Sequence, residues 1–195
     1  MTRATGAPRS APRPKEGPPA PESGDLWVFG YGSLMWRPGF EYLARQGARV
    51  YGWRRSLCIY SHVYRGTPDR PGLVLGLDRG GACHGVVFRV AASLREPTIE
   101  YLRRRELVTA VYVERTVVAH LADGTKARAL TYVADRTHPQ YAGFLDHDRL
   151  LSLVLQGAGQ SGPNADYVLN TEAHLRENGI RDPTLEWLAL QLRRA

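Results

Sequence analysis

Cysteine is scarce in this sequence, which contains Cys58 and Cys83 and no other cysteine in 195 residues. Two isolated cysteines supply neither a disulfide framework nor the ligand spacing of a zinc site. The N-terminal region also lacks the apolar core of a secretory signal peptide, so we expect the protein to reside in the reducing cytoplasm. Both cysteines are then expected to be small residues of the core or of strands.

Long hydrophobic runs are missing as well. No stretch approaches the roughly 18 to 20 consecutive apolar residues of a membrane-spanning helix, so we expect no integral membrane protein. Hydrophobic residues make up 43% of the chain and charged residues 23%, which is typical of globular proteins and excludes wholesale disorder. A chain of 195 residues has room for one domain with a sizeable core, but not for two ordinary domains.

Histidines with the spacing of metal ligands are also lacking. None of the six forms an i, i+4 pair on a predicted helix with a third ligand nearby. The six are His62, His84, His120, His138, His147 and His174. We therefore predict no metal site.

Acidic residues are in deficit, because 19 Asp and Glu face 26 Lys and Arg, which gives a formal net charge of +7. Basic residues attract polyanions through counterion release, so a nucleic-acid partner has to be considered. The charge is spread along the chain, however, and the tight cluster Arg103–Arg105 falls in a predicted helix, where a solvated face explains it. We expect a small anionic partner and neither nucleic acid nor membrane. A non-catalytic module that binds small anions or nucleic acid remains the alternative.

Residues 1–24 differ in composition from the remainder. They hold six of the 13 prolines together with Gly, Ala and Arg, and they show no apolar period. Such a composition cannot bury a core, so we predict a disordered extension. The folded domain is then expected to span residues 25–195.

Most of the predicted elements are strands. The signals are aromatic, β-branched or alternating runs that are bounded by Gly and Pro. Gly80-Gly81 is expected to form a turn between two strands, and Asp123-Gly124 is expected to close a tight hairpin. The predicted strands cover residues 26–31, 49–60, 73–77, 84–90, 111–121 and 127–133.

Helices are predicted at residues 97–106, 146–156, 164–178 and 182–190. Gly157 is placed as a C-terminal cap, while Asn164 and Asp182 are placed as N-terminal caps. The order of elements is therefore strands, one helix, a hairpin and more helices. This order predicts an α+β fold in which a mostly antiparallel sheet curls into a small barrel with flanking helices.

One carboxylate falls on the apolar side of the first predicted helix. Ile99, Leu102 and Glu106 follow an i, i+3, i+7 spacing, so Glu106 is expected to be partly buried. Burial raises the pKa of a carboxyl group and makes it a usable proton acceptor. The spacing alone favours the alternative, which is a structural glutamate paired with Arg105 or another arginine.

The glycines of Gly30-Tyr31-Gly32-Ser33-Leu34 suggest a ligand-binding turn after the first strand. Glycine lets the backbone approach a ligand closely, and successive free N–H groups bind a carboxylate or an oxyanion. The Gly-Lys-Ser/Thr ending of a phosphate-binding loop and the third glycine of a dinucleotide motif are both missing. An ordinary glycine turn is the alternative.

The stretch from Val28 to Trp36 resembles the N-terminal signature of the ChaC-type γ-glutamylcyclotransferases, and the resemblance extends over about residues 26–190. In the animal branch of that family two glycines and a tyrosine closely follow the catalytic glutamate, whereas Leu107 to Val111 precede Tyr112 here, which resembles the bacterial branch. Further matching segments occur in the order of the family. These are Arg65-Gly66-Thr67, Pro71 to Leu75, Gly85-Val86, Arg105-Glu106 with Tyr112, His138 to Tyr141, and Asn164 to Tyr167.

The resemblance implies a lyase that acts on glutathione and releases 5-oxoproline and cysteinylglycine without a metal or an organic cofactor. It also implies that Glu106 is the proton acceptor. The same reaction on other γ-glutamyl amino acids or γ-glutamylamines is the nearest alternative. Roles for Arg65, Tyr112, Tyr141 and Tyr167 stay open, and the sequence does not indicate an oligomeric state. The implied substrate-binding residues are Val28, Phe29, Gly30, Tyr31, Gly32, Ser33 and Leu34.

Overall fold

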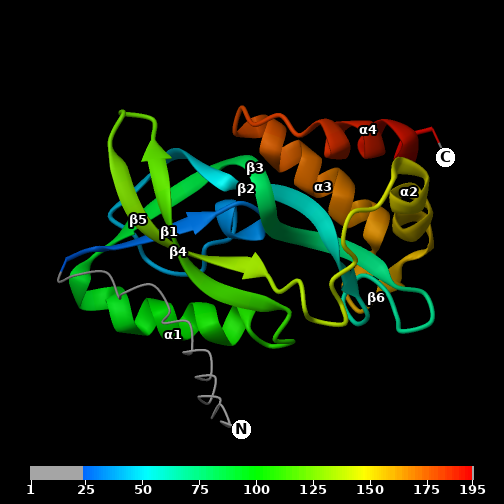
Figure 1. The fold of residues 1–195 in the computed structure, drawn as a ribbon, viewed down its shortest axis with the longest axis horizontal. Coiled ribbons are helices and arrows are strands. Elements are labelled where there is room, and N and C mark those ends of the chain that lie inside the picture. The colour runs from blue at the N-terminus through cyan, green and yellow to red at the C-terminus, as the bar shows by residue number, and fades with distance from the viewer. Residues whose placement is uncertain (1–23, 195) are drawn as a thin grey trace, which may run out of the picture.

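The computed structural model describes residues 24–194, and five of its strands form a closed barrel in the order β1-β3-β2-β4-β5 (Figure 1). Neighbouring strands are antiparallel except β1 and β5, which pair in parallel and close the barrel. The predicted α+β barrel is confirmed. The extension expected over residues 1–24 lies outside the described residues, except for Gly24. The barrel strands are β1 (Leu26–Gly30), β2 (Ala44–Ser61), β3 (Gly72–Val90), β4 (Tyr112–Leu121) and β5 (Lys126–Ala134).

Strand β3 is one long strand where the sequence predicted two. It continues through Gly80 and Gly81, whose φ angles are +99° and +68°, and Gly52 on β2 has a φ of +79°. The register between the two strands shifts in this region, between Tyr51 and Trp53. The positive φ angles therefore mark a bulge that bends a long two-stranded ribbon. The predicted turn at Gly80-Gly81 is wrong, and β2 begins five residues earlier than expected.

The hairpin of β4 and β5 is confirmed. Gly124 has a φ of +85°, and the Asp123 carboxylate accepts hydrogen bonds from the backbone N–H of Thr125 at 2.9 Å and from its hydroxyl at 2.6 Å. An aspartate followed by a glycine with positive φ is a common solution for such a turn.

The four predicted helices are present (Figure 1). Helix α1 (Arg95–Glu106) runs along the lower side of the barrel in Figure 1, and α2 (His147–Gln156), α3 (Asn164–Glu177) and α4 (Pro183–Leu192) gather at its upper right. None of the helices between residues 24 and 194 is long and apolar enough to cross a membrane. The shorter elements are the 3₁₀ helices η1 (Ser33–Met35) and η2 (Ala92–Leu94) and the strands β6 (Ala158–Gly159) and β7 (Gly162–Pro163).

The predicted helix caps have different outcomes. Asp182 caps α4 as expected, because its carboxylate accepts from the Leu185 N–H at 3.2 Å. Asn164 does not cap α3 with its side chain; the Asn164 amide binds the backbone of Leu73 instead. Gly157 ends α2 with a φ of −74°, which is not left-handed. A side chain at this glycine would meet backbone atoms at 2.6 to 2.7 Å, so close packing requires glycine there.

Both cysteines are buried, as predicted. Burial raises the pKa of the Cys58 thiol to about 12 and also raises the pKa of Cys83. A thiol that stays protonated at neutral pH is a poor nucleophile, so both cysteines are structural residues of the barrel.

Candidate active site

A cavity of about 190 Å³ opens where β1 runs into η1. Its wall combines a turn, the start of β3, the end of α1 and one residue each from β4, β5 and α3. The fold thus brings together segments that are more than 100 residues apart in the sequence. The lining residues are Tyr31, Gly32, Ser33, Leu34, Val74, Leu75, Glu106, Tyr112, Tyr132 and Tyr167.

Glu106 is the last residue of α1 and contributes a carboxylate to this cavity. Its side chain is 19% exposed, and Leu102, one turn earlier, is fully buried. Burial raises the pKa of Glu106 above its usual value, and the neighbouring Arg105 guanidinium lowers it again only in part. Glu106 Oε1 lies 3.1 Å from Arg105 Nε. The ion pair with Arg105 and the cavity position, which were alternatives in the sequence, therefore occur together.

Arg105 also ties the end of α1 to the segment that follows β1. Its guanidinium donates to the Arg37 carbonyl at 2.6 Å, to Ser33 Oγ at 3.0 Å and to the Tyr101 hydroxyl at 3.2 Å. A guanidinium with several fixed acceptors holds its neighbours in a defined geometry. The position of Glu106 relative to the glycine turn is set by these contacts.

The turn itself presents backbone donors. The Gly32 carbonyl accepts from the Met35 N–H at 2.8 Å, while the N–H groups of Gly32, Ser33 and Leu34 have no acceptor among residues 24–194. A Cβ on Gly32 would touch only Leu75 Cδ1, at 3.6 Å, so the missing side chain leaves room in the cavity. Unsatisfied N–H groups at the start of a helical turn suit an anionic ligand.

The residues that the resemblance assigned to substrate binding divide into two groups. Tyr31, Gly32, Ser33 and Leu34 line the cavity, whereas Val28, Phe29 and Gly30 belong to β1 and are buried in the barrel. At Gly30 a Cβ would lie 3.1 Å from Leu34 Cβ, so this glycine allows the turn to fold back on the strand. Val28, Phe29 and Gly30 therefore position the four residues that line the cavity.

Side chains replace a missing strand along one edge of β3. At residues 73–75 β3 pairs with β2 on its other side, and β1 pairs only with residues 86–90. The Tyr112 hydroxyl donates to the Leu75 carbonyl at 2.7 Å, and the Leu75 N–H donates to the Tyr167 hydroxyl at 3.1 Å. Asn164 binds both backbone groups of Leu73, at 2.6 and 2.7 Å. The unpaired edge is therefore satisfied and becomes one wall of the cavity.

Burial keeps the phenols of this wall neutral. It raises the pKa of Tyr167 to about 12, and it raises the pKa values of Tyr31 and Tyr112 well above their usual value. Tyr167 accepts from Leu75, so its own proton is available to a ligand in the cavity. The open question about Tyr112 and Tyr167 thus receives a structural answer, because both line the cavity.

Two other candidates do not line it. Arg65 donates to the carbonyls of Ser161 and Pro163, at 2.5 and 3.1 Å, and its guanidinium lies over the Tyr167 ring at 5.5 Å. The Tyr141 hydroxyl donates to the buried carboxylate of Asp78 at 3.2 Å. Arg65 thus supports the wall from behind, and Tyr141 belongs to a separate ionic network.

Tyr132 is a lining residue that the sequence did not single out. It lies on β5, is buried, and donates to Glu114 Oε2 at 3.2 Å. A tyrosine in an apolar strand has no local signal that distinguishes a cavity residue from a core residue.

A second cavity of about 190 Å³ adjoins the first. Val74, Glu106 and Tyr112 line both, so the Glu106 carboxylate stands at their common wall. The second cavity is bordered by residues 59–64 and 108–111 and is more apolar. No three His, Cys, Asp or Glu side chains in the described part of the chain are grouped to hold a metal ion.

Comparisons with known proteins agree with this arrangement. A family model described as ChaC-like protein matches residues 26–195. The glutathione-specific gamma-glutamylcyclotransferase of Escherichia coli (strain K12) is 32% identical over 174 residues, covering 89% of this chain and 75% of that protein. Glutathione-specific gamma-glutamylcyclotransferase 1 of Danio rerio is 33% identical over 167 residues, covering 82% of this chain and 85% of that protein.

A solved structure shows the same fold. The crystal structure of a γ-glutamylcyclotransferase specific to glutathione from yeast matches with a TM-score of 0.77 at 22% sequence identity, covering 88% of this chain and 96% of that chain. The similarity to the Escherichia coli protein is consistent with the bacterial branch. The family model, the sequence relatives and the barrel together establish that this chain belongs to the ChaC family.

Proposed function

We propose that this protein cyclises the γ-glutamyl group of glutathione and releases 5-oxoproline and cysteinylglycine. The observation that carries the proposal is the largely buried Glu106 carboxylate, which has a raised pKa and lies in one cavity with three backbone N–H groups that have no acceptor among residues 24–194. The names of the relatives from Escherichia coli and Danio rerio support glutathione as the substrate.

Glu106 serves as the proton acceptor in this proposal. The α-amino group of the substrate is an ammonium and becomes a nucleophile once Glu106 removes a proton. Its nitrogen then attacks the γ-carbonyl carbon and closes a five-membered ring. As the amide C–N bond breaks, the proton moves from Glu106 to the departing nitrogen of cysteinylglycine. The regenerated carboxylate then takes the second proton from the ring nitrogen and passes it to the new amino group of cysteinylglycine or to solvent. One carboxyl group serves both halves of the reaction, and its raised pKa suits both roles.

The remaining lining groups hold the substrate in the reactive conformer. The N–H groups of Gly32, Ser33 and Leu34 bind the α-carboxylate or the negative charge that develops on the carbonyl oxygen. The attack is intramolecular, so a fixed, folded conformer supplies the proximity that the reaction requires. The more apolar neighbouring cavity has the position to hold cysteinylglycine, because it meets the first at Glu106.

Two finer predictions remain from the sequence. The same chemistry on other γ-glutamyl amino acids or γ-glutamylamines is the alternative to glutathione, because specificity depends on pocket contacts and not on the fold. A cytoplasmic location and the absence of nucleic-acid, membrane, metal and cofactor partners also stay predictions.

The test is to incubate purified protein, without added metal, with glutathione and separately with a γ-glutamyl dipeptide, and to measure 5-oxoproline by mass spectrometry. We expect product from glutathione. Product from the dipeptide alone would keep the reaction and change the substrate. No product from either would favour the non-catalytic binding module.

Glu106→Gln tests the proton acceptor. The amide keeps the shape of the side chain but cannot accept the proton, so we expect turnover to fall by at least a thousandfold while glutathione binding persists. Glu100→Gln is the matched control, because Glu100 lies on the same helix with a side chain that is 69% exposed, and it should retain full activity. Full activity of Glu106→Gln would refute the assignment.

A further inference from the structure

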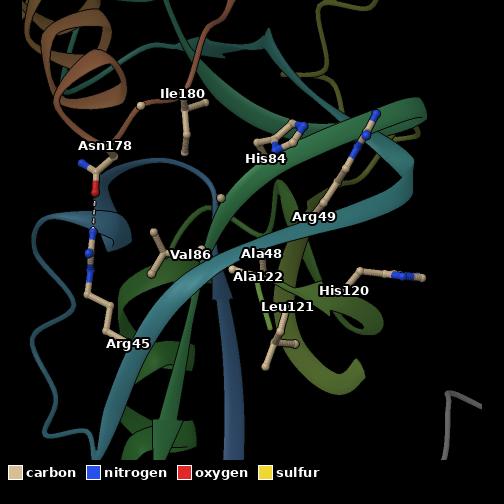
Figure 2. A pocket seen from close by; sticks show the side chains of 13 residues that line it. Arg45, Ala48, Arg49, His84, Val86, His120, Leu121, Ala122, Asn178 and Ile180 are labelled. Carbon is tan, nitrogen blue, oxygen red and sulfur yellow. Dashed lines mark hydrogen bonds between the residues drawn. The ribbon is translucent and has the colours of Figure 1, made fainter. Parts of the chain in front are cut away.

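A third hollow, of about 450 Å³, lies on the outer face of the barrel (Figure 2). It is formed by β2, β3, the end of β4 and the turn between α3 and α4, and it shares no lining residue with the Glu106 cavity. None of its 13 lining residues is acidic, and four are arginine or histidine. The reaction proposed above makes no use of this surface.

Three of the four basic residues form a row across neighbouring strands. Arg49 on β2 is paired in register with His84 on β3 and with His120 on β4. Directly opposed residues of antiparallel strands extend from the same face of the sheet, with Cβ atoms about 5 Å apart. In Figure 2 the Arg49 side chain rises beside the His84 ring, and His120 extends from the other side of Arg49.

The donors of this row are free. The Arg49 guanidinium lies over the Tyr51 ring at 4.9 Å, and nothing in residues 24–194 accepts a hydrogen bond from it. The His120 ring packs edge-on against Tyr51 at 4.9 Å, and neither histidine ring has a hydrogen-bond partner in that part of the chain. Arg45, in contrast, is already bound to Asn178 Oδ1 at 2.6 Å. Tyr51 thus holds Arg49 in place without neutralising it.

The positive charge of Arg49 has no carboxylate partner among residues 24–194. Arg55 donates to the His84 carbonyl at 2.7 Å, and burial together with the charges of Arg49 and Arg55 lowers the pKa of His84. The carboxylates of Asp123 and Asp182 already have other partners. Asp123 is bound to Thr125 within its own turn, and Asp182 pairs with Arg55 at 3.4 Å. An anion is therefore the ligand that the row lacks.

We propose that this hollow binds an organic phosphate monoester, with its phosphate between Arg49 and His84 and with His120 beside them. A phosphate monoester carries up to two charges and three acceptor oxygens, which matches several donors on one face of the sheet better than a carboxylate does. A hollow of about 450 Å³ has room for more than the phosphate. Val86 and Ile180 provide an apolar wall for the organic part. The site is independent of glutathione cyclisation.

The first test uses the full-length wild-type protein and adenosine monophosphate as the probe. We expect saturable shifts of the ring signals of His84 and His120 in nuclear magnetic resonance spectra, with at least tenfold weaker binding of inorganic phosphate and of succinate at constant ionic strength. Unmoved His84 signals would overturn the proposal. Equal affinity for inorganic phosphate would show that the organic part of the ligand contributes nothing to binding. Equal affinity for succinate would show that the site does not select phosphate.

The second test compares two variants that lose the same charge. Arg49→Gln should weaken the binding of adenosine monophosphate at least tenfold, as measured by calorimetry. Arg149→Gln, at an exposed position of α2 outside the hollow, should change the affinity by less than twofold. Equal losses in both variants would indicate attraction by net charge and no site. Displacement of adenosine monophosphate by a much more tightly bound single-stranded oligonucleotide would indicate a nucleic-acid surface instead.

Discussion

The Glu106 carboxylate is subject to two opposing influences. Burial raises its pKa, and Arg105, 3.1 Å away, favours the charged form. The net direction is upward, so the proton acceptor is lost by protonation at a higher pH than an ordinary glutamate would be. We expect the acidic limb of the pH profile of kcat/KM to lie above the usual glutamate pKa.

Arg105→Gln tests the balance between burial and the Arg105 charge at the Glu106 carboxylate. Removal of the positive charge leaves burial unopposed, so the pKa of Glu106 rises further and the acidic limb moves to higher pH. The rate itself also falls, because Arg105 holds the turn at Ser33 and Arg37, and the normalised pH profile is therefore the readout. Arg104→Gln, whose parent side chain is 71% exposed, should leave the profile unchanged. A limb that stays in place in Arg105→Gln would contradict this account.

At the scale of elements, Asn164 replaces part of a strand. Its amide satisfies the buried N–H and carbonyl of Leu73 at an edge where β3 has no neighbour. Asn164→Ala leaves both backbone groups without a partner, so we expect a loss of about 2–4 kcal/mol in the free energy of unfolding. Urea denaturation measures it. Asn170→Ala, at an exposed position of the same helix, should change stability by less than about 0.5 kcal/mol.

The same residue shows where sequence reasoning fails. An asparagine before a helix is a common cap, and the periodicity that located α3 is local, so the helix was predicted correctly. The actual partner of Asn164 lies 91 residues away in the chain, and no local pattern indicates it. The prediction of a turn at Gly80-Gly81 failed for a similar reason. A turn and a bulge both need positive φ angles, and the pairing of β3 with β2 decides between them.

The candidate site was predictable to the extent that local patterns encode it. The i, i+3, i+7 spacing placed Glu106 toward the interior, and the family motifs identified the glycine turn. The place of Tyr132 in the cavity wall and the meeting of two cavities at Glu106 were not predictable, because they depend on how β3, β4, β5 and α1 come together in the fold. Long-range pairing of this kind has no signature in a single sequence.

At the scale of the whole molecule, a buried carboxylate links three segments of the barrel. Asp78 on β3, with a side chain 1% exposed, is 3.0 Å from Arg54 on β2 and 2.7 Å from Arg136 after β5. The Tyr141 hydroxyl donates to it at 3.2 Å. Burial alone would raise the pKa of Asp78, but hydrogen bonds from Arg136, the Arg79 backbone and Tyr141 outweigh burial and lower it.

This network gives stability a defined dependence on pH. A carboxyl group whose pKa is lower in the folded than in the unfolded protein stabilises the fold above the unfolded pKa, and this contribution is lost as pH falls through the folded pKa. We expect Asp78→Asn to lower the free energy of unfolding by about 2–4 kcal/mol near pH 7, because two arginines lose their common partner. The difference from wild type should shrink below about pH 4, where protonation begins to remove the same charge in the wild-type protein.

Denaturation at several pH values measures this difference in stability, with Asp69→Asn in an exposed loop as the control. A difference that stays constant down to pH values well below the ordinary aspartate pKa would show that packing, and not the charge of Asp78, links these segments.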